Sequence, residues 1–152
     1  MPVFEYEAEY PCSAEGLFDF LSRPANLMQI TRPDIGLKFN TAPEVTSEGA
    51  QLDFQIMTMG QVIKASHKIT AFERPRQVIE QQITGPMKAW VHHHTYEVTS
   101  AGTVKRDRIE FQLPGGLIGL LLSESKVKDH LEDGMFHNEQ KLRELIQQGV
   151  IA

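Results

Sequence analysis

The sequence predicts a single α+β domain in which one antiparallel sheet covers a long helix near the C-terminus. Between residues 37 and 113, apolar and polar side chains alternate with period two, and turn residues interrupt them about every ten positions, which is typical of an antiparallel meander. From residue 120 onward, apolar side chains instead recur at steps of three and four, as on one face of a helix. The 152 residues, 41% of them hydrophobic, suffice for one core without disulfides or a structural metal.

The first segment is expected to be a strand followed by two short helices. Residues 3–10 place aromatic and alanine side chains on one face and three glutamates on the other, as a half-buried strand requires. Ser13 is suited to cap a helix over 14–21, because its hydroxyl can accept a hydrogen bond from the first turn. Pro24 favours a second short helix over 25–30, since proline is tolerated in a first turn.

The meander is divided into six further strands by glycine and proline. The turns fall at Glu48-Gly49, Gly60, Pro75, Gly85-Pro86 and Gly102. The predicted strands are 37–42, 51–59, 61–72, 77–83, 88–98 and 103–112.

The terminal helix is expected to start near Leu120 and to end at Gly149. Its apolar stripe contains Val127, Leu131, Met135, Leu142 and Leu145. Asn138 and Glu124 fall on the same arc at 100° per residue, so the Asn138 amide is expected to point inward. That amide either contacts a ligand or makes a local capping or water-bridged contact, whereas Glu124 suits the positive end of the helix.

Composition and charge exclude several classes of function. The net charge of −5 and the scattered basic residues leave no positive surface for nucleic acid. No apolar run approaches the roughly 20 residues of a membrane span, and the glutamates of 3–10 do not fit a signal peptide. A single cysteine, Cys12, is typical of a reducing compartment, so a cytoplasmic location is expected.

The strongest candidate for a site lies in the predicted strand 88–98. Period two places Trp90, His92, His94 and Tyr96 on one face, which Val98 continues, and the apolar members mark this face as interior. Interior imidazoles need hydrogen-bond partners, because an unpaired buried polar group costs about 1–3 kcal/mol. These partners are either a ligand or the core itself.

Neither a metal nor a cofactor is expected. A His-x-His pair can chelate, but a zinc site needs at least a third protein ligand, and no neighbouring string supplies one. His67 is the one candidate, and it shares an apolar face with Ile63 and Ile69 that is typical of a core position. No phosphate-binding or dinucleotide-binding glycine motif and no nucleophile motif occurs.

Residues 117–122 combine an apolar run with the preceding Gly115-Gly116 pair. This segment would gate a cavity for an apolar ligand, touch a membrane surface transiently, or dock the start of the helix onto the short helices. Phe54 and Ile56 face the same way as Leu52 in the strand 51–59, toward the predicted interior.

The order of the elements resembles that of the helix-grip superfamily of START-like, polyketide-cyclase-like and birch-pollen-allergen-like proteins. Three strings are similar to a bacterial branch labelled cyclase/dehydrase or SRPBCC-like: ANLMQITRP at 25–33, QQITGPMKAWVHHHTYE at 81–97 and DRIEFQLPGGLIGLL at 107–121. The branch commonly has an arginine just after the helix phenylalanine, where this chain has His137 after Phe136. The resemblance implies a curved sheet that grips the helix around a largely apolar cavity.

Polar groups on apolar faces predict the binding of a small hydrophobic or amphipathic ligand, such as a lipid, a quinone or a polyketide-like molecule. One alternative is a cyclase or dehydratase in which His92, His94 and Tyr96 act as acid and base. Another is a co-chaperone-type protein-interaction module. The composition carries no information on the oligomeric state. The residues expected to bind the ligand are Trp90, His92, His94, Tyr96, Phe54, Ile56, His67, Leu131, Met135 and Asn138.

Overall fold

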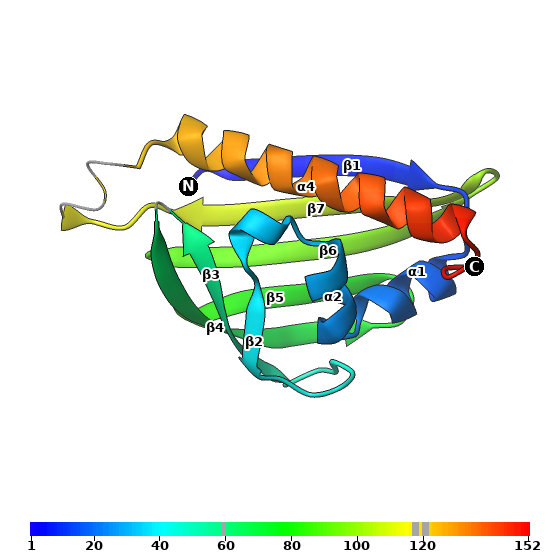
Figure 1. Ribbon diagram of the computed structural model, residues 1–152, viewed down its shortest axis with the longest axis horizontal. Helices are drawn as coiled ribbons and strands as arrows, with labels where there is room; N and C mark the ends of the chain where they lie inside the picture. Colours follow the sequence, from blue (N-terminus) through cyan, green and yellow to red (C-terminus); the bar gives the residue numbers. More distant parts are fainter. Residues whose placement is uncertain (59, 117–118, 120–121) are drawn as a thin grey trace.

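The computed structural model describes residues 1–58, 60–116, 119 and 122–152. These residues form a seven-stranded antiparallel sheet in the order β1-β7-β6-β5-β4-β3-β2 and a long helix, α4 (Glu124–Gln147), which lies along β1 and β7 (Figure 1). The predicted α+β layout is confirmed. The strands are β1 (Val3–Tyr10), β2 (Lys38–Thr41), β3 (Gln51–Thr58), β4 (Gln61–Glu73), β5 (Gln77–Thr84), β6 (Ala89–Thr99) and β7 (Gly102–Gln112).

The alternation in β1 gives the strand two different faces. Phe4, Ala8 and Tyr10 are buried, whereas the glutamates point outward. In the register with β7, Glu7 lies opposite Arg106 and forms an ion pair of 2.9 Å with it, and Glu5 similarly approaches Arg108. Exposed pairs of this kind contribute little stability each, so burial of the aromatic face holds β1 in place.

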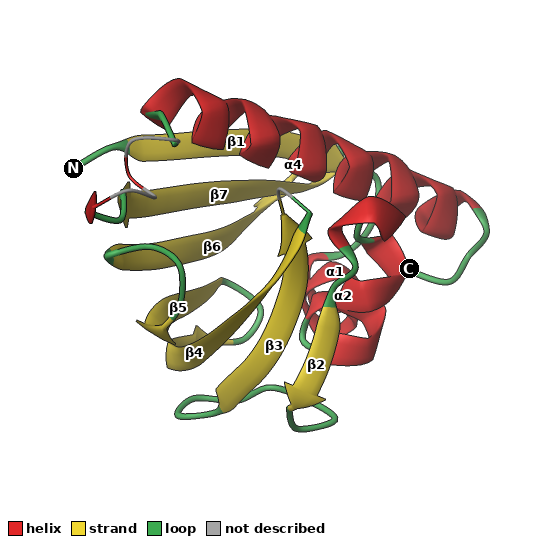
Figure 2. Cartoon of the chain, turned by 60° about the vertical axis from the view of Figure 1, so that its left-hand side comes forward, coloured by secondary structure: helices red, strands yellow, loops and turns green. Residues whose placement is uncertain are grey.

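The two short helices, α1 (Ala14–Leu21) and α2 (Pro24–Ile30), follow β1 as predicted and close one end of the curved sheet (Figure 2). The hydroxyl of Ser13 accepts a hydrogen bond from the Gly16 amide at 3.0 Å, as an N-cap does. Leu17 and Phe18 of α1 are almost completely buried. A single 3-10 turn, η1 (Pro33–Ile35), leads from α2 into β2.

The long helix α4 (Glu124–Gln147) starts later than predicted. Leu122 and Ser123 are not helical, and the Ser123 hydroxyl accepts a hydrogen bond from the amide of Lys126. Because this cap defines the first turn, Glu124 lies at the helix start, half exposed and paired with Lys128. Phe136 is 57% exposed, which agrees with its place opposite the apolar stripe.

The core consists of two apolar clusters that α4 connects. One joins α1, α2 and the C-terminal half of α4, and it contains Leu17, Phe18, Ile30, Tyr96 and Leu142. The other lies under the N-terminal half of α4 and contains Phe4, Ile109, Phe111 and Val127 with Trp90 and Leu131 packed against it.

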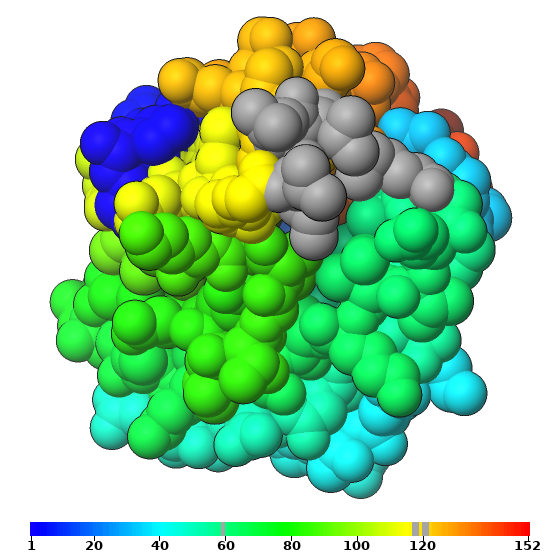
Figure 3. Space-filling view, turned by 90° about the vertical axis from the view of Figure 1, so that its left-hand side faces the viewer, coloured from blue at the N-terminus to red at the C-terminus, as the bar shows by residue number. Residues whose placement is uncertain are grey.

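Figure 3 views the end of the molecule where the N-terminus, the end of β7 and the first turns of α4 lie together. The membrane-contact hypothesis concerned residues 117–122, of which 117, 118, 120 and 121 lie outside the described residues. None of the described helices is both long and apolar enough to cross a membrane.

The β6–β7 hairpin depends on a glycine. Gly102 pairs with Thr99 directly after the turn and has a φ of 144°, a value that side chains other than glycine rarely adopt. A Cβ atom at this position would lie 2.1 Å from the carbonyl oxygen of Tyr10. The end of β1 therefore packs directly on the backbone of the hairpin.

Gly102→Ala is expected to lower the free energy of unfolding by about 1–3 kcal/mol, through backbone strain and the clash with Tyr10. Urea denaturation monitored by circular dichroism would measure the change. Gly115→Ala is the control, because a Cβ atom there meets no atom of the described residues within 4 Å. Equal stability of the two variants would contradict the role of Gly102.

Candidate functional site

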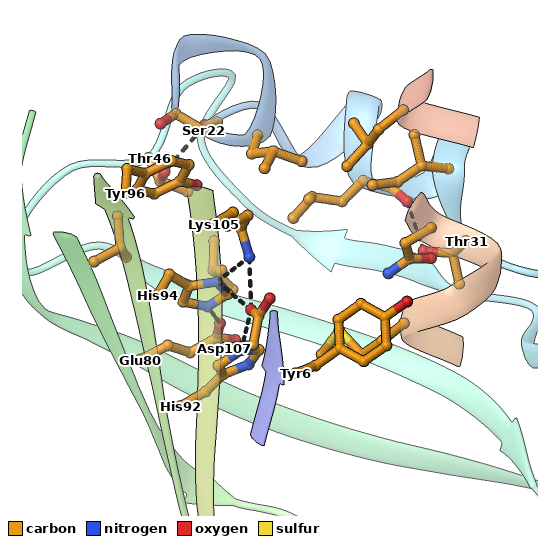
Figure 4. Close-up of a pocket in the computed structure, with 18 of the residues that line it drawn as sticks. Tyr6, Ser22, Thr31, Thr46, Glu80, His92, His94, Tyr96, Lys105 and Asp107 are labelled. Atoms are coloured by element: carbon orange, nitrogen blue, oxygen red, sulfur yellow. Dashed lines mark hydrogen bonds and ion pairs between the residues drawn. The ribbon is translucent and has the colours of Figure 1, made fainter. Parts of the chain in front are cut away.

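The concave face of the sheet carries a cluster of charged and imidazole side chains in an otherwise apolar interior. It comes from three neighbouring strands, β5, β6 and β7, and four of its five side chains are joined by contacts drawn in Figure 4 around Asp107. We call this cluster the polar wall: Glu80, His92, His94, Lys105 and Asp107.

The strand register creates the polar wall. Side chains directly opposite one another on antiparallel strands share a face and lie close together. Alternation along β6 turns its even-numbered residues inward, as predicted for Trp90 to Tyr96, but Val98 is 71% exposed because the strand continues past the core. The cross-strand pairs are His92 with Glu80, His94 with Asp107 and Tyr96 with Lys105.

Oδ1 of Asp107 is the centre of the polar wall. It accepts hydrogen bonds from Nε2 of His92 at 2.7 Å and Nζ of Lys105 at 2.6 Å. Nδ1 of His94 lies 3.3 Å from the same oxygen. Asp107 and Lys105 are both buried, so the ion pair is shielded from solvent.

Glu80 makes a second centre beside the first. Its Oε2 accepts a hydrogen bond of 2.6 Å from Nδ1 of His67, and its Oε1 lies 3.3 Å from Nε2 of His94. His94 therefore connects the two carboxylates, with one ring nitrogen toward each. Its ring also stacks on that of His92, with centroids 3.6 Å apart.

The polar wall forms one side of a cavity of about 230 Å³ between the sheet, the two short helices and α4. Of the ten residues predicted to bind a ligand, five line this cavity: His92, His94, Tyr96, Met135 and Asn138. Half of the sixteen other lining residues are aliphatic. These apolar residues are Leu21, Leu27, Ile30, Leu37, Leu52, Ile69, Val78 and Leu142.

The other five predicted residues do not line the cavity. Trp90 and Leu131 pack in the second apolar cluster. Phe54 meets His67 edge to face at 4.7 Å, and His67 reaches the cavity only indirectly, through Glu80. Ile56 lies opposite Ile63 on β4. Pattern analysis found the correct face of these strands but not how far the cavity extends along it.

Asn138 makes a structural contact. With its amide oriented to satisfy its neighbours, the side-chain nitrogen donates to the carbonyl oxygens of Ile30 at 2.9 Å and Gly134 at 3.1 Å. The amide thus ties α4 to the end of α2. The sequence left open whether this amide contacts a ligand or makes a local contact, and its nitrogen makes the local contact.

Glu80, Lys105 and Asp107 were missed as site residues by pattern analysis. Charged residues are normally exposed. The available signal was that Lys105 and Asp107 occupy the same face of β7 as the apolar Ile109 and Phe111. Glu80 likewise shares a face of β5 with the apolar Val78.

The expectation that no third metal-binding group lies near the two histidines was wrong, because Glu80, His92 and His94 each place a donor atom within 4.8 Å of the others. The rings of the two histidines are nevertheless stacked with an angle of only 20° between their planes. Their in-plane lone pairs do not converge on one point, as tetrahedral coordination requires. As arranged, the group does not fit a metal ion.

Comparison with known proteins identifies the fold. No family model and no curated protein matches the chain. Among solved structures, the protein TTHA0849 of Thermus thermophilus is similar with a TM-score of 0.77 at 12% identity, over 97% of this chain and 99% of that one. Ara h 8.0201 is similar with a TM-score of 0.66 at 14% identity, over 92% and 94% of the two chains. The chain has the helix-grip fold.

A further helix-grip neighbour is a Rhodobacter sphaeroides protein with a TM-score of 0.71 at 12% identity, over 96% of this chain and 93% of that one. Identities this low establish the fold alone. In a helix-grip protein the curved sheet and the long helix enclose an interior space, and here the polar wall lies on the sheet side of that space.

The two carboxylates in this helix-grip cavity have pKa values that differ from those of exposed carboxylates. Burial opposes ionisation of Asp107, but Lys105 and the two histidines hold its pKa well below the usual range. Burial likewise opposes ionisation of Glu80, but His67 and His94 lower its pKa. Both carboxylates are therefore ionised at neutral pH.

The pKa values of the two stacked histidines are shifted in opposite directions. Burial, together with the neighbouring His94, lowers the pKa of His92 to about 4, despite its hydrogen bond to Asp107. Burial and Lys105 also act to lower the pKa of His94, but its contacts with Asp107 and Glu80 prevail and raise it. A neutral His92 thus stacks on a His94 that favours the protonated form.

Stability is expected to fall by roughly 3 kcal/mol as pH decreases from about 6.5 to 4, because unfolded His92 takes up a proton there and folded His92 does not. The raised pKa of His94 adds stability, and this contribution is complete below about pH 6.5 and is lost only as pH rises above that value. Stability in urea, measured at a series of pH values, checks this. In His92→Gln the decline between about pH 6.5 and 5 should disappear, whereas the loss nearer pH 4 that comes from the lowered pKa values of Glu80 and Asp107 should remain. An unchanged slope between about pH 6.5 and 5 would contradict the assignment.

Proposed function

We propose that this protein binds a small apolar or amphipathic molecule in the cavity between the sheet and α4. The observation that carries the proposal is the composition of the cavity: eight aliphatic side chains surround it, and a compact polar wall closes one side. Small-molecule sites are usually built in this way, with many apolar contacts and a few polar groups that orient the ligand.

Two further features support binding over a purely structural role. A core that served only stability would gain nothing from two carboxylates, a lysine and two histidines in its interior, since replacing buried ion pairs by apolar residues is often neutral or stabilising. The polar wall also faces an empty volume of about 230 Å³, larger than the gaps left in a close-packed interior. Lipids, quinones and polyketide-like molecules are the ligand classes that the helix-grip resemblance suggests.

Leu27→Trp is expected to abolish binding, because the indole would fill the apolar part of the cavity, which Leu27 lines. Native mass spectrometry of protein purified from its own source would show a bound molecule in the wild type and an apo mass in the variant. Val98→Trp is the matched control, since Val98 is 71% exposed and outside the cavity lining. Equal occupancy in both variants would contradict the location of the site.

The second candidate function is acid–base catalysis in the same cavity, of the cyclase or dehydratase type. The observation that favours it is the opposite displacement of the pKa values of His92 and His94, since acid and base roles are assigned by environments that separate two pKa values. Tyr96, whose pKa burial raises, would remain a hydroxyl donor at neutral pH.

Catalysis is expected to depend on His94. Incubation of a bound compound with wild-type protein should convert it at a rate with a histidine-like inflection in pH, and His94→Gln should lower this rate by roughly a hundredfold or more. Mass analysis of the extracted compound over time would measure the rate. Binding without conversion in both proteins would reject the enzymatic function and leave the binding function intact.

A further inference from the structure

The hydrogen-bond donors and acceptors of the polar wall are largely used by one another. Glu80 offers one oxygen to His67 and the other to His94. Oδ1 of Asp107 receives three groups, from His92, Lys105 and His94. These internal contacts determine which charges of the wall are already balanced.

The arrangement favours an imidazolium at His94. Its Nε2 donates to Glu80, its Nδ1 lies 3.3 Å from Oδ1 of Asp107, and the ring therefore sits between two carboxylates, which raise its pKa. His92 faces a single carboxylate through Nε2, and burial with the neighbouring His94 lowers its pKa, so its ring is neutral. Nζ of Lys105 lies 3.4 Å from Nδ1 of His94 and would donate to it in a neutral ring, whereas in the imidazolium both groups have Oδ1 of Asp107 as their common partner.

The charges of the polar wall therefore cancel. Glu80 and Asp107 are negative, whereas Lys105 and His94 are positive. On the helix side of the cavity, Tyr6 donates to Glu139, whose charge is balanced in turn by Arg143 at 2.9 Å. A buried charge without a partner is costly, so a charged ligand would disturb a balance that already exists.

We infer that the cavity selects an uncharged head group that both donates and accepts hydrogen bonds, carried on an apolar body of about two fused rings: a hydroxyarene or a similar hydroxylated apolar molecule. This inference rests on the proposed binding function. It adds the chemical class of the ligand.

Two unused bonding positions support a hydroxyl group. Lys105 has three N–H groups and gives one to Asp107, so it retains donors on the side that lines the cavity. Among the described residues, every hydrogen bond to Asp107 ends on Oδ1, and Figure 4 shows its second oxygen outside the dashed contacts. A ligand hydroxyl can accept from Lys105 and donate to this oxygen.

The volume limits the apolar body. An apolar cavity of about 150 Å³ holds one benzene ring. The 230 Å³ available here therefore accommodates roughly two fused rings in the same packing. The apolar lining opposite the polar wall, from Leu27 and Ile30 to Leu142, suits such a body.

Three probes of the same size test the inference: 2-naphthol, 2-naphthoate and 2-naphthylmethylammonium. Isothermal titration calorimetry at about pH 6, where His94 is protonated and His92 is neutral, would measure each affinity. We expect wild-type protein to bind 2-naphthol at least about tenfold more tightly than either ion.

Two substitutions should shift the preference in opposite directions. Lys105→Met leaves the polar wall with one net negative charge, so the ammonium probe should gain about tenfold relative to 2-naphthol. Glu80→Gln leaves one net positive charge as long as the remaining contact with Asp107 keeps His94 protonated, so 2-naphthoate should gain similarly, and more so at about pH 5 than at about pH 6. Lys141→Met is the control, because it removes an exposed lysine of α4 outside the cavity lining and should leave the order unchanged.

The outcomes separate the inference from the proposed function. If either ion binds wild-type protein as tightly as 2-naphthol, or if both variants keep the wild-type order, the head-group inference is overturned while the cavity still binds. If no probe binds but native mass spectrometry finds a captured molecule, the inferred size and class are wrong. If no probe binds and the native mass is that of the apo protein, both proposals fail. Circular dichroism confirms that each variant is folded, and either variant alone is sufficient for the comparison.

Discussion

A single carboxylate oxygen, Oδ1 of Asp107, holds the interior of this protein in its observed arrangement. It draws an ammonium and two imidazoles from neighbouring strands to one point inside an apolar shell. Removing one partner from such a buried group leaves another without its counterpart, which is why polar clusters in cores behave as units. The stacking of His92 on His94 and the position of the Lys105 side chain both follow from it.

The fold was predictable from the sequence because its elements are locally encoded. Period two in the meander, the cap at Ser13 and the three-to-four spacing of the terminal helix each arise within a few residues. The start of α4 was misplaced because an apolar run before Ser123 continues the helical pattern, and only the cap shows where the helix begins. Hydrophobicity alone does not show at which residue α4 begins.

The site was predictable only in part, because it depends on pairing between strands. Alternation placed His92, His94 and Tyr96 on the interior face, but their partners lie on β5 and β7, and strand register depends on turn geometry across the whole hairpin. Lys105 and Asp107 are residue types that usually lie on the surface. The strand register explains their burial, because it places them opposite Tyr96 and His94 of β6. The extent of the cavity, which excludes Trp90 and Ile56, depends on helix packing that no strand pattern contains.

The two-residue turn between Thr99 and Gly102 gives the interior chemistry an unusual dependence on chain length. Side-chain orientation alternates along a strand, so inserting or deleting one residue in this turn, with β6 held in place, would rotate the inward residues of β7 to the solvent side. The ammonium and the carboxylate would leave the interior, and the arginines of the outer face would enter it. The chemistry of the cavity in this chain therefore depends on the length of a turn that contributes no side chain to it.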